Sequence, residues 1–208
     1  MSARRAFRRP LSRRRSTVPA AVVAIAAALT LSACGSGGSS GGGGQTQFVQ
    51  GEGGVDVVKD RGGRRAAPDL SGKTLDGKEL DIAEAYKGKI VVLNVWGSWC
   101  SPCRAEAKNL VTVANAYKDK GVEFVGLDTR DPDPAPAIAF EKEFKVPYPS
   151  LYDSAGKLLL RFPNGSLNPQ AIPSTVFIDR DGKIAARALK ALSEDDLRRT
   201  LDPLVAEK

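Results

Sequence analysis

Two cysteines, Cys100 and Cys103, stand three positions apart in the stretch Trp99-Cys100-Ser101-Pro102-Cys103. If a helix begins here, its first turn places their Cα atoms roughly 5–6 Å apart, the span that a disulfide needs. A helix N-terminus stabilises a thiolate through its dipole and its unpaired N–H groups, and such settings lower a cysteine pKa from about 8.5 to about 3.5–7.5. We therefore interpret Cys100 as an attacking thiol and Cys103, one turn further in and less exposed, as the thiol that resolves a mixed disulfide.

A structural disulfide and half of a metal site are the alternative interpretations of this pair. Zinc needs further sulfur or imidazole ligands. The chain has no histidine, and its third cysteine, Cys34, lies in the N-terminal segment. The missing histidine also removes a covalent haem site, since Arg104 follows Cys103. The sequence thus predicts no metal and no bound cofactor.

The elements that must position the two cysteines are visible in the hydrophobic pattern. Residues 90–96 form a nearly continuous apolar run, typical of a strand buried on both faces. A helix should follow over about 102–118, with Gly121 just past its end, and residues 122–127 form a second apolar strand. The cysteines would then lie at the carboxyl end of a buried strand, where open α/β sheets place their sites.

The remaining pattern indicates an α/β sandwich with a mixed central sheet. Turn signals at 76–77 and 181–182 predict an N-terminal β-hairpin over 70–82 and a second hairpin over 174–189. Ser193 and Asp196 have the spacing of a capping signature for a final helix. Residues 131–171 are more than one helix and its loops require, so we expect an inserted helix near 135–144 and a short strand near 150–152.

Residues 94–106 resemble the active-site stretch of the TlpA/ResA-like branch of the thioredoxin superfamily, and residues 172–179 resemble its proline loop and following strand. Residues 131–171 match its characteristic insertion, so the resemblance covers about 67–208. It implies a thioredoxin-like three-layer sandwich and dithiol–disulfide exchange with protein partners. It also implies no bound cofactor.

The resemblance gives roles to three further residues. Pro173 falls where the family has a cis-proline facing the disulfide, which would expose the backbone of Ile172 for strand-like pairing with a substrate. The alternative is a trans proline that opens an edge strand. Glu106 stands where the branch carries an active-site acid, one turn beyond Cys103, so we assign it proton exchange with that thiol. A glutamate that only complements the helix dipole is the alternative.

Asn94 departs from thioredoxin itself, which has a buried aspartate here that relays protons. An amide cannot ionise, so Asn94 cannot take that role. Trp96 and Trp99 are expected to shape the apolar rim of the site, with Trp99 as a substrate-binding residue.

The N-terminal segment reads as an export signal. Residues 1–33 hold seven arginines and no acid, and they include an apolar run at 18–31 that is too short to span a bilayer. Residues 31–34 resemble a bacterial lipobox, which predicts a cleaved signal peptide over 1–33 and lipidation of Cys34. An incidental cysteine is the alternative. The Gly/Ser-rich residues 34–66 are expected to be a flexible tether, and 67–208 the folded domain.

These observations bound the function. The formal charge of +7 is carried by the N-terminal arginines, and the chain from residue 34 onward holds equal numbers of basic and acidic residues. No basic stripe indicates nucleic acid as a partner. We expect a monomeric oxidoreductase, lipid-anchored on the extracytoplasmic face. The resemblance to the TlpA/ResA-like branch implies that it reduces apocytochrome c and is served by a membrane electron donor. The alternatives are an oxidase for secreted proteins, a peroxiredoxin-like peroxidase and a non-catalytic binding module.

Overall fold

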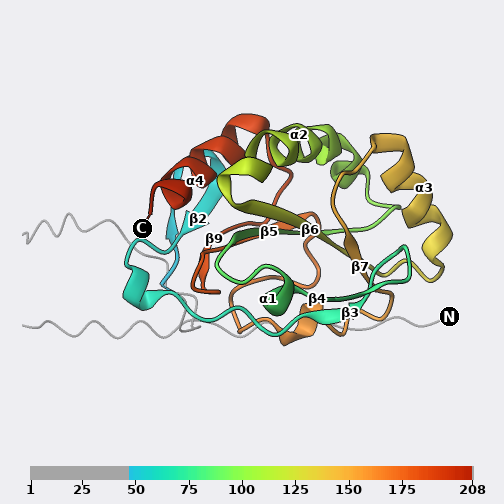
Figure 1. Ribbon diagram of the computed structural model, residues 1–208, viewed down its shortest axis with the longest axis horizontal. Helices are drawn as coiled ribbons and strands as arrows, with labels where there is room; N and C mark the ends of the chain where they lie inside the picture. The colour runs from blue at the N-terminus through green and yellow to red at the C-terminus, as the bar shows by residue number, and fades with distance from the viewer. Residues whose placement is uncertain (1–46, 208) are drawn as a thin grey trace, which may run out of the picture. The chain divides into compact units, whose positions relative to one another are not determined.

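The computed structural model describes residues 47–207, so the predicted signal peptide, Cys34 and the start of the tether lie outside the described residues. Within that range the main sheet has seven strands in the order β1-β2-β9-β8-β5-β6-β7 (Figure 1). Its parallel strands are β5 (Ile90–Trp96), β6 (Val122–Thr129) and β7 (Ser150–Asp153). Its antiparallel strands are β8 (Ser174–Ile178), β9 (Ile184–Ala188), β2 (Val55–Val57) and β1 (Val49–Gln50).

Helices and a hairpin cover the two faces of this sheet (Figure 1). One face carries α2 (Ser101–Tyr117) and α4 (Glu194–Ala206). The opposite face carries α1 (Ile82–Ala85) and the hairpin of β3 (Ser71–Lys73) and β4 (Glu79–Asp81). The predicted three-layer sandwich with a mixed sheet and an N-terminal hairpin is therefore confirmed. Single 3-10 turns occur at Glu52–Gly54, Arg61–Gly63, Lys118–Lys120 and Leu159–Arg161.

Strand β5 is the centre of the fold, and every one of its residues is buried. Because side chains alternate along a strand, Ile90 and Val92 pack with α2 and α4. Val91, Leu93 and Val95 pack into the core on the opposite face. Burial on both faces explains the continuous apolar run.

The predicted insertion is present as α3 (Pro134–Phe144) followed by β7. Helix α3 packs against the end of β5 through an aromatic cluster, and Arg104 at the start of α2 lies over the α3 rings. The rings of Trp96 and Phe140 have centroids 4.4 Å apart, and those of Phe140 and Phe144 are 4.6 Å apart. The insertion therefore forms one wall around the two cysteines.

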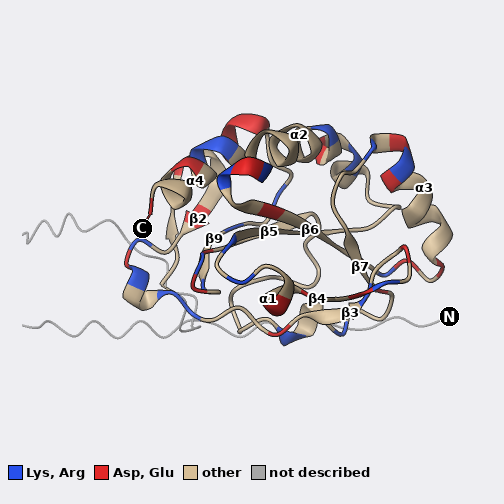
Figure 2. Ribbon diagram, in the orientation of Figure 1, with Lys and Arg blue, Asp and Glu red and all other residues tan. Residues whose placement is uncertain are grey.

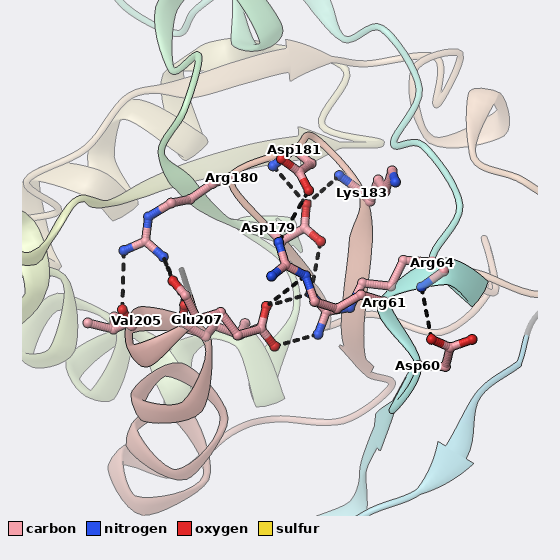
Figure 3. Close-up of polar contacts among 11 residues, drawn as sticks. Asp60, Arg61, Arg64, Asp179, Arg180, Asp181, Lys183, Val205 and Glu207 are labelled. Carbon is pink, nitrogen blue, oxygen red and sulfur yellow. Dashed lines mark hydrogen bonds and ion pairs between the residues drawn. The ribbon is translucent and has the colours of Figure 1, made fainter.

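The predicted boundary between tether and domain at residue 67 is wrong, because residues 47–66 belong to the fold. Strand β2 pairs with β9, with Val55 opposite Ala188. The buried guanidinium of Arg64 donates to Asp179 at 2.9 Å and to both carboxylate oxygens of Glu207 at 2.6 and 2.7 Å (Figure 3). This ion cluster joins the N-terminal segment to the β8–β9 turn and to the end of α4.

Charged side chains of both signs share the surface of the described domain. Figure 2 shows basic and acidic residues next to one another on α3 and α4. None of the helices within residues 47–207 is long and apolar enough to cross a membrane.

Candidate active site

The loop that joins β5 to α2 places Cys100 at the start of the helix. The amide of Cys100 donates to the carbonyl of Gly97 at 3.1 Å, which closes the turn. Cys100 is the N-cap of α2, and its Sγ accepts a hydrogen bond from the amide of Cys103 at 3.2 Å. Pro102 lies in the first turn of α2, where a backbone N–H has no partner within the helix, so the missing N–H of proline costs no hydrogen bond. A thiolate at Cys100 would face the same amide and the positive end of the helix.

Cys100 and Cys103 form a disulfide, with an S–S distance of 2.06 Å and Cα atoms 5.3 Å apart. This confirms the pairing and the Cα separation expected from their spacing. Cys100 is 3% exposed and Cys103 is 2% exposed. Exposure therefore hardly distinguishes the two sulfur atoms in the oxidised protein, and the position of Cys100 at the helix N-terminus is what separates them.

Glu106, three residues after Cys103 on α2, is buried, with only 1% of its surface exposed. Its Oε1 accepts from the Asn94 side-chain amide at 2.9 Å, and its Oε2 accepts from the Leu192 backbone N–H at 2.8 Å. Burial raises the pKa of this carboxyl to about 7, against the opposing effect of those two hydrogen bonds. Glu106 is not the first-turn residue that the dipole interpretation assumed, because it lies beyond the first turn of α2 and is buried.

Asn94 and Leu192 are site residues whose roles were not predicted. The Asn94 amide bridges Glu106 and the hydroxyl of Thr175, which it reaches at 3.1 Å. Asn94 does not ionise, as expected, but it orients the group that does. The position of Asn94 in the buried strand could have suggested this role. The contact from Leu192 spans 86 positions and has no local signal.

A small cavity lies behind Cys103, with a volume of about 10 Å³. This is close to the space that one water molecule requires. Its polar lining comes from Asn94, Cys103 and Tyr148, and apolar side chains complete it. A water here would lie within the group of residues that surrounds the Cys103 sulfur.

The proline loop lies against the disulfide as the family resemblance implied. The Ile172–Pro173 peptide bond is cis, which confirms that expectation. Pro173 is buried, whereas Ile172 is partly buried and packs against the cluster that contains Cys100 and Cys103.

The two tryptophans have different surroundings. Trp99 is 53% exposed, and the Arg130 guanidinium lies 4.9 Å from its ring centroid. Trp96 is buried in the aromatic cluster with Phe140. The expectation of an apolar rim therefore holds for Trp99 only, and Trp96 is part of the core beneath the site.

Asp131 holds the loop that precedes Cys100, and sequence reasoning missed it. Its carboxylate accepts from the Ser98 backbone N–H and from the Ser98 hydroxyl, both at 2.7 Å. Its own carbonyl accepts from the Tyr152 hydroxyl at 2.9 Å. Only the predicted topology could have indicated this contact, since β5 and β6 are parallel neighbours and the loops that follow them lie side by side.

No cluster of three or more Cys, Asp or Glu side chains within residues 47–207 is arranged to hold a metal ion. The chemistry that the Cys100–Cys103 pair supports is thiol–disulfide exchange, and a buried carboxyl lies three residues after Cys103.

Curated relatives of this chain are thiol–disulfide exchange proteins. The thiol–disulfide oxidoreductase ResA of Bacillus cereus is 30% identical over 133 residues, which are 64% of this chain and 73% of that protein. The thiol:disulfide interchange protein HelX of Rhodobacter capsulatus is 34% identical over 125 residues, 60% of this chain and 65% of that protein.

Solved structures of related proteins are also similar to this chain. A DsbF homologue from Corynebacterium diphtheriae superposes with a TM-score of 0.67 at 32% identity, covering 75% of this chain and 96% of that one. A secreted thiol–disulfide isomerase from Corynebacterium glutamicum has a TM-score of 0.69 at 28% identity, covering 79% and 100%.

The family model for redoxin matches residues 62–202, which include both cysteines, Glu106 and the proline loop. The match begins before residue 67, in agreement with the ordered N-terminal segment. With the Cys100–Cys103 disulfide at a helix N-terminus, these likenesses show that the chain belongs to the redoxin family and is a ResA-like thiol–disulfide oxidoreductase of the thioredoxin superfamily.

Proposed function

We propose that this oxidoreductase acts outside the cytoplasm, held to the membrane by a lipid on Cys34, and that it reduces disulfides in other proteins. The lipobox-like residues 31–34 support the anchor. The secreted structural relative from Corynebacterium glutamicum supports the location. The substrate that the resemblance to the TlpA/ResA-like branch suggests is apocytochrome c before haem attachment, with a membrane electron donor.

The reaction transfers two electrons in two exchange steps. The Cys100 thiolate attacks a substrate disulfide, forms a mixed disulfide with one substrate sulfur and releases the other as a thiolate. Cys103 then loses its proton and attacks the Cys100 sulfur, which forms the internal disulfide and releases the second substrate thiolate. A dithiol donor must reduce Cys100–Cys103 before the next cycle.

The observation that carries the proposed direction is the buried Glu106 carboxyl. It lies three residues after Cys103 on α2, and burial raises its pKa to about 7. At neutral pH it can accept the Cys103 proton during resolution. Its ionised form also opposes a thiolate at Cys103, because like charges disfavour each other in a buried setting. Destabilising the reduced form in this way makes the protein a better reductant.

Substrate binding is assigned to the surface beside the disulfide. Trp99 offers an exposed aromatic face next to Cys100. The backbone of Ile172 is assigned strand-like pairing with an extended substrate segment, and the cis peptide bond to Pro173 supports this assignment.

The reduction potential tests the direction of electron flow. A value near or below that of thioredoxin, about −270 mV, is expected for a reductant. A value near that of the oxidant DsbA, about −120 mV, would contradict the proposal. Reduction of insulin by the purified domain would be a first check that the exchange itself occurs.

An oxidase for secreted proteins is the second candidate function. It is favoured by the position of Cys100 at the N-terminus of α2, because a stabilised thiolate stabilises the reduced form and makes the protein more oxidising. Trapping distinguishes the two. Cys103→Ser should hold its substrate as a stable mixed disulfide through Cys100, isolated from membranes under non-reducing conditions. An apocytochrome in the adduct supports the reductant, and many different secreted proteins support the oxidase.

Cys100→Ser is the matched control for that experiment, because it removes the attacking thiol and leaves Cys103 in place. It should form no adduct. Adducts through Cys103 in Cys100→Ser, with none in Cys103→Ser, would reverse the assignment of the two thiols.

A further inference from the structure

Asp128 is a carboxyl group buried at the carboxyl end of β6. It is 0% exposed, and it lies in the sheet between Trp96 of β5 and Tyr152 of β7. Among the described residues, no donor makes a hydrogen bond to either of its carboxyl oxygens. An ionised carboxylate without donors or a cation is very costly in such a setting.

The residues that follow Asp128 contact the loop before Cys100 at two points. Arg130 has a positive φ of 61°, in the left-handed region, and its guanidinium lies over the exposed Trp99 ring. Asp131 is buried and accepts both hydrogen bonds from Ser98. One turn therefore holds Ser98 and Trp99, the two residues before the reactive cysteine.

Three other acidic groups face Asp128. They are Asp131 in the same turn, Glu141 on α3 and Asp153 on β7. Asp153 is itself satisfied by three backbone amides, those of Lys157, Leu158 and Leu159. The nearby cation, Arg130, is directed to Trp99. Burial, the interaction with the Asp131 side chain and the surrounding acidic charges raise the pKa of Asp128 to about 9.

We propose that Asp128, as a neutral carboxylic acid, donates a hydrogen bond to the Asp131 carboxylate, and that this pair positions residues 97–99 and through them the Cys100 sulfur. Protonation of Asp128 explains why no donor contacts its carboxyl oxygens, because the protonated acid is itself the donor. When that proton is lost, two buried carboxylates repel each other. The contact between Asp131 and Ser98 then loosens. Asp131 and Asp128 are thus positioning residues.

The oxidised protein offers a direct test, because its disulfide cysteines do not titrate. Tryptophan fluorescence is recorded from about pH 6 to about pH 10.5, a range that spans the raised pKa, in the wild type and in Asp128→Asn. The wild type should show a transition centred near pH 9, reported by Trp99. Asp128→Asn should lose it, because an amide remains a neutral donor at every pH. Asp119→Asn, an exposed acid in the turn after α2, is the matched control and should keep the transition.

A second measurement keeps the proposal testable if Asp128→Asn does not fold. The ¹³Cγ chemical shift of Asp128 is followed by NMR in the oxidised wild type. A protonated carboxyl at neutral pH supports the pair, and a carboxylate at neutral pH overturns it. Identical fluorescence profiles in the wild type and a folded Asp128→Asn would overturn it as well.

The effect on chemistry is measured with the reduced protein and a small aromatic disulfide as probe. Asp131→Asn should slow the attack of Cys100 at neutral pH by several-fold, and Ser98→Ala by a smaller factor, since the Ser98 amide still donates. Unchanged rates in both variants would refute the positioning role. This part rests on the proposed assignment of Cys100 as the attacking thiol, whereas the fluorescence and NMR titrations do not. If the trapping experiment fails but the pH transition of Asp128 is observed, the assignment of Cys100 is overturned and the Asp128–Asp131 hydrogen bond still stands.

Discussion

Replacing Glu106 by Gln separates the charge of this residue from its shape. The carboxyl is 1% exposed and bonded to Asn94 and Leu192. Glutamine can keep the acceptor for the Leu192 amide. Its NH₂ group can donate to Asn94 if the Asn94 side chain turns over to present its oxygen. The variant should therefore fold with the same packing and lose the ionisable group.

The sign of the pH dependence follows from the raised pKa. A carboxyl whose pKa is higher in the folded protein stabilises it fully at low pH, and that stabilisation is lost as the pH rises through the folded pKa. For Glu106 the ordinary value is 4.5 and the folded value is about 7. At about 1.4 kcal/mol for each unit of pKa, the wild type should lose about 3 kcal/mol between about pH 4 and about pH 9. The Glu106→Gln variant should lose none of this stability, because its side chain does not ionise.

Urea unfolding of the two oxidised proteins measures this difference. The free energy of unfolding of Glu106→Gln, minus that of the wild type, should increase by about 3 kcal/mol from about pH 4 to about pH 9. Glu84→Gln makes the same change at an exposed site on α1. It should differ from the wild type by no more than about 0.5 kcal/mol at either pH. A difference for Glu106→Gln that is the same at both pH values would refute the reasoning.

The same variant tests the chemistry of resolution. Above neutral pH the ionised Glu106 opposes a thiolate at Cys103, so Glu106→Gln should lower the pKa of that thiol. It should also slow the release of substrate from the mixed disulfide, because the proton acceptor is gone. Thiol titration and single-turnover exchange measure the two effects, and a change in neither would remove Glu106 from the mechanism.

Three further predictions concern other parts of the chain. Cys34→Ala should release the protein from the membrane or leave it unprocessed, and an intact-mass spectrum showing an unmodified Cys34 in membrane-bound wild type would contradict the lipid anchor. Arg64→Ala should lower the free energy of unfolding by about 3–5 kcal/mol, measured in urea, because it leaves Asp179 and Glu207 without their buried cation; a loss below about 1 kcal/mol would show that the ion cluster matters little. Trp99→Ala should change stability by no more than about 0.5 kcal/mol while lowering kcat/KM for a protein disulfide more than for a small one; equal losses would argue against a role in substrate binding.

The central part of the fold could be predicted because its signals are local. The apolar run of β5 is buried on both faces, and α2 begins at Ser101, after the N-cap Cys100, with a proline in its first turn. The final helix begins with the capping box that Ser193 and Asp196 indicate. Each of these features depends on residues close together in sequence.

Strands β1 and β2 could not be predicted in the same way. They are two and three residues long and lie among glycines and polar residues. What stabilises β2 is its pairing with β9, which is distant in the sequence. In such short strands tertiary contacts decide the structure, and the local composition favours coil.

The same distinction between local and long-range signals applies to the residues of the site. Cys100, Cys103, Glu106 and Pro173 fall within two recognisable stretches of sequence. Their partners do not, because the Leu192 amide and the Asp131 carboxylate come from loops that only the sheet brings to the site. The raised pKa of Glu106 is likewise a property of its surroundings, since its largest cause is burial.

Both edges of the main sheet are obstructed, and this affects how the protein behaves at high concentration. At one edge the outermost strand, β1, is only two residues long. At the other, the amide of Leu75 donates to the carbonyl of Ser150, and Thr74 bridges to Leu151, so the β3–β4 hairpin lies along β7. Long unpaired edges are where sheets join between molecules and aggregation begins. A shortened form that starts at residue 67 would lose β1 and β2, uncover the edge of β9, and be expected to aggregate where the longer domain stays in solution.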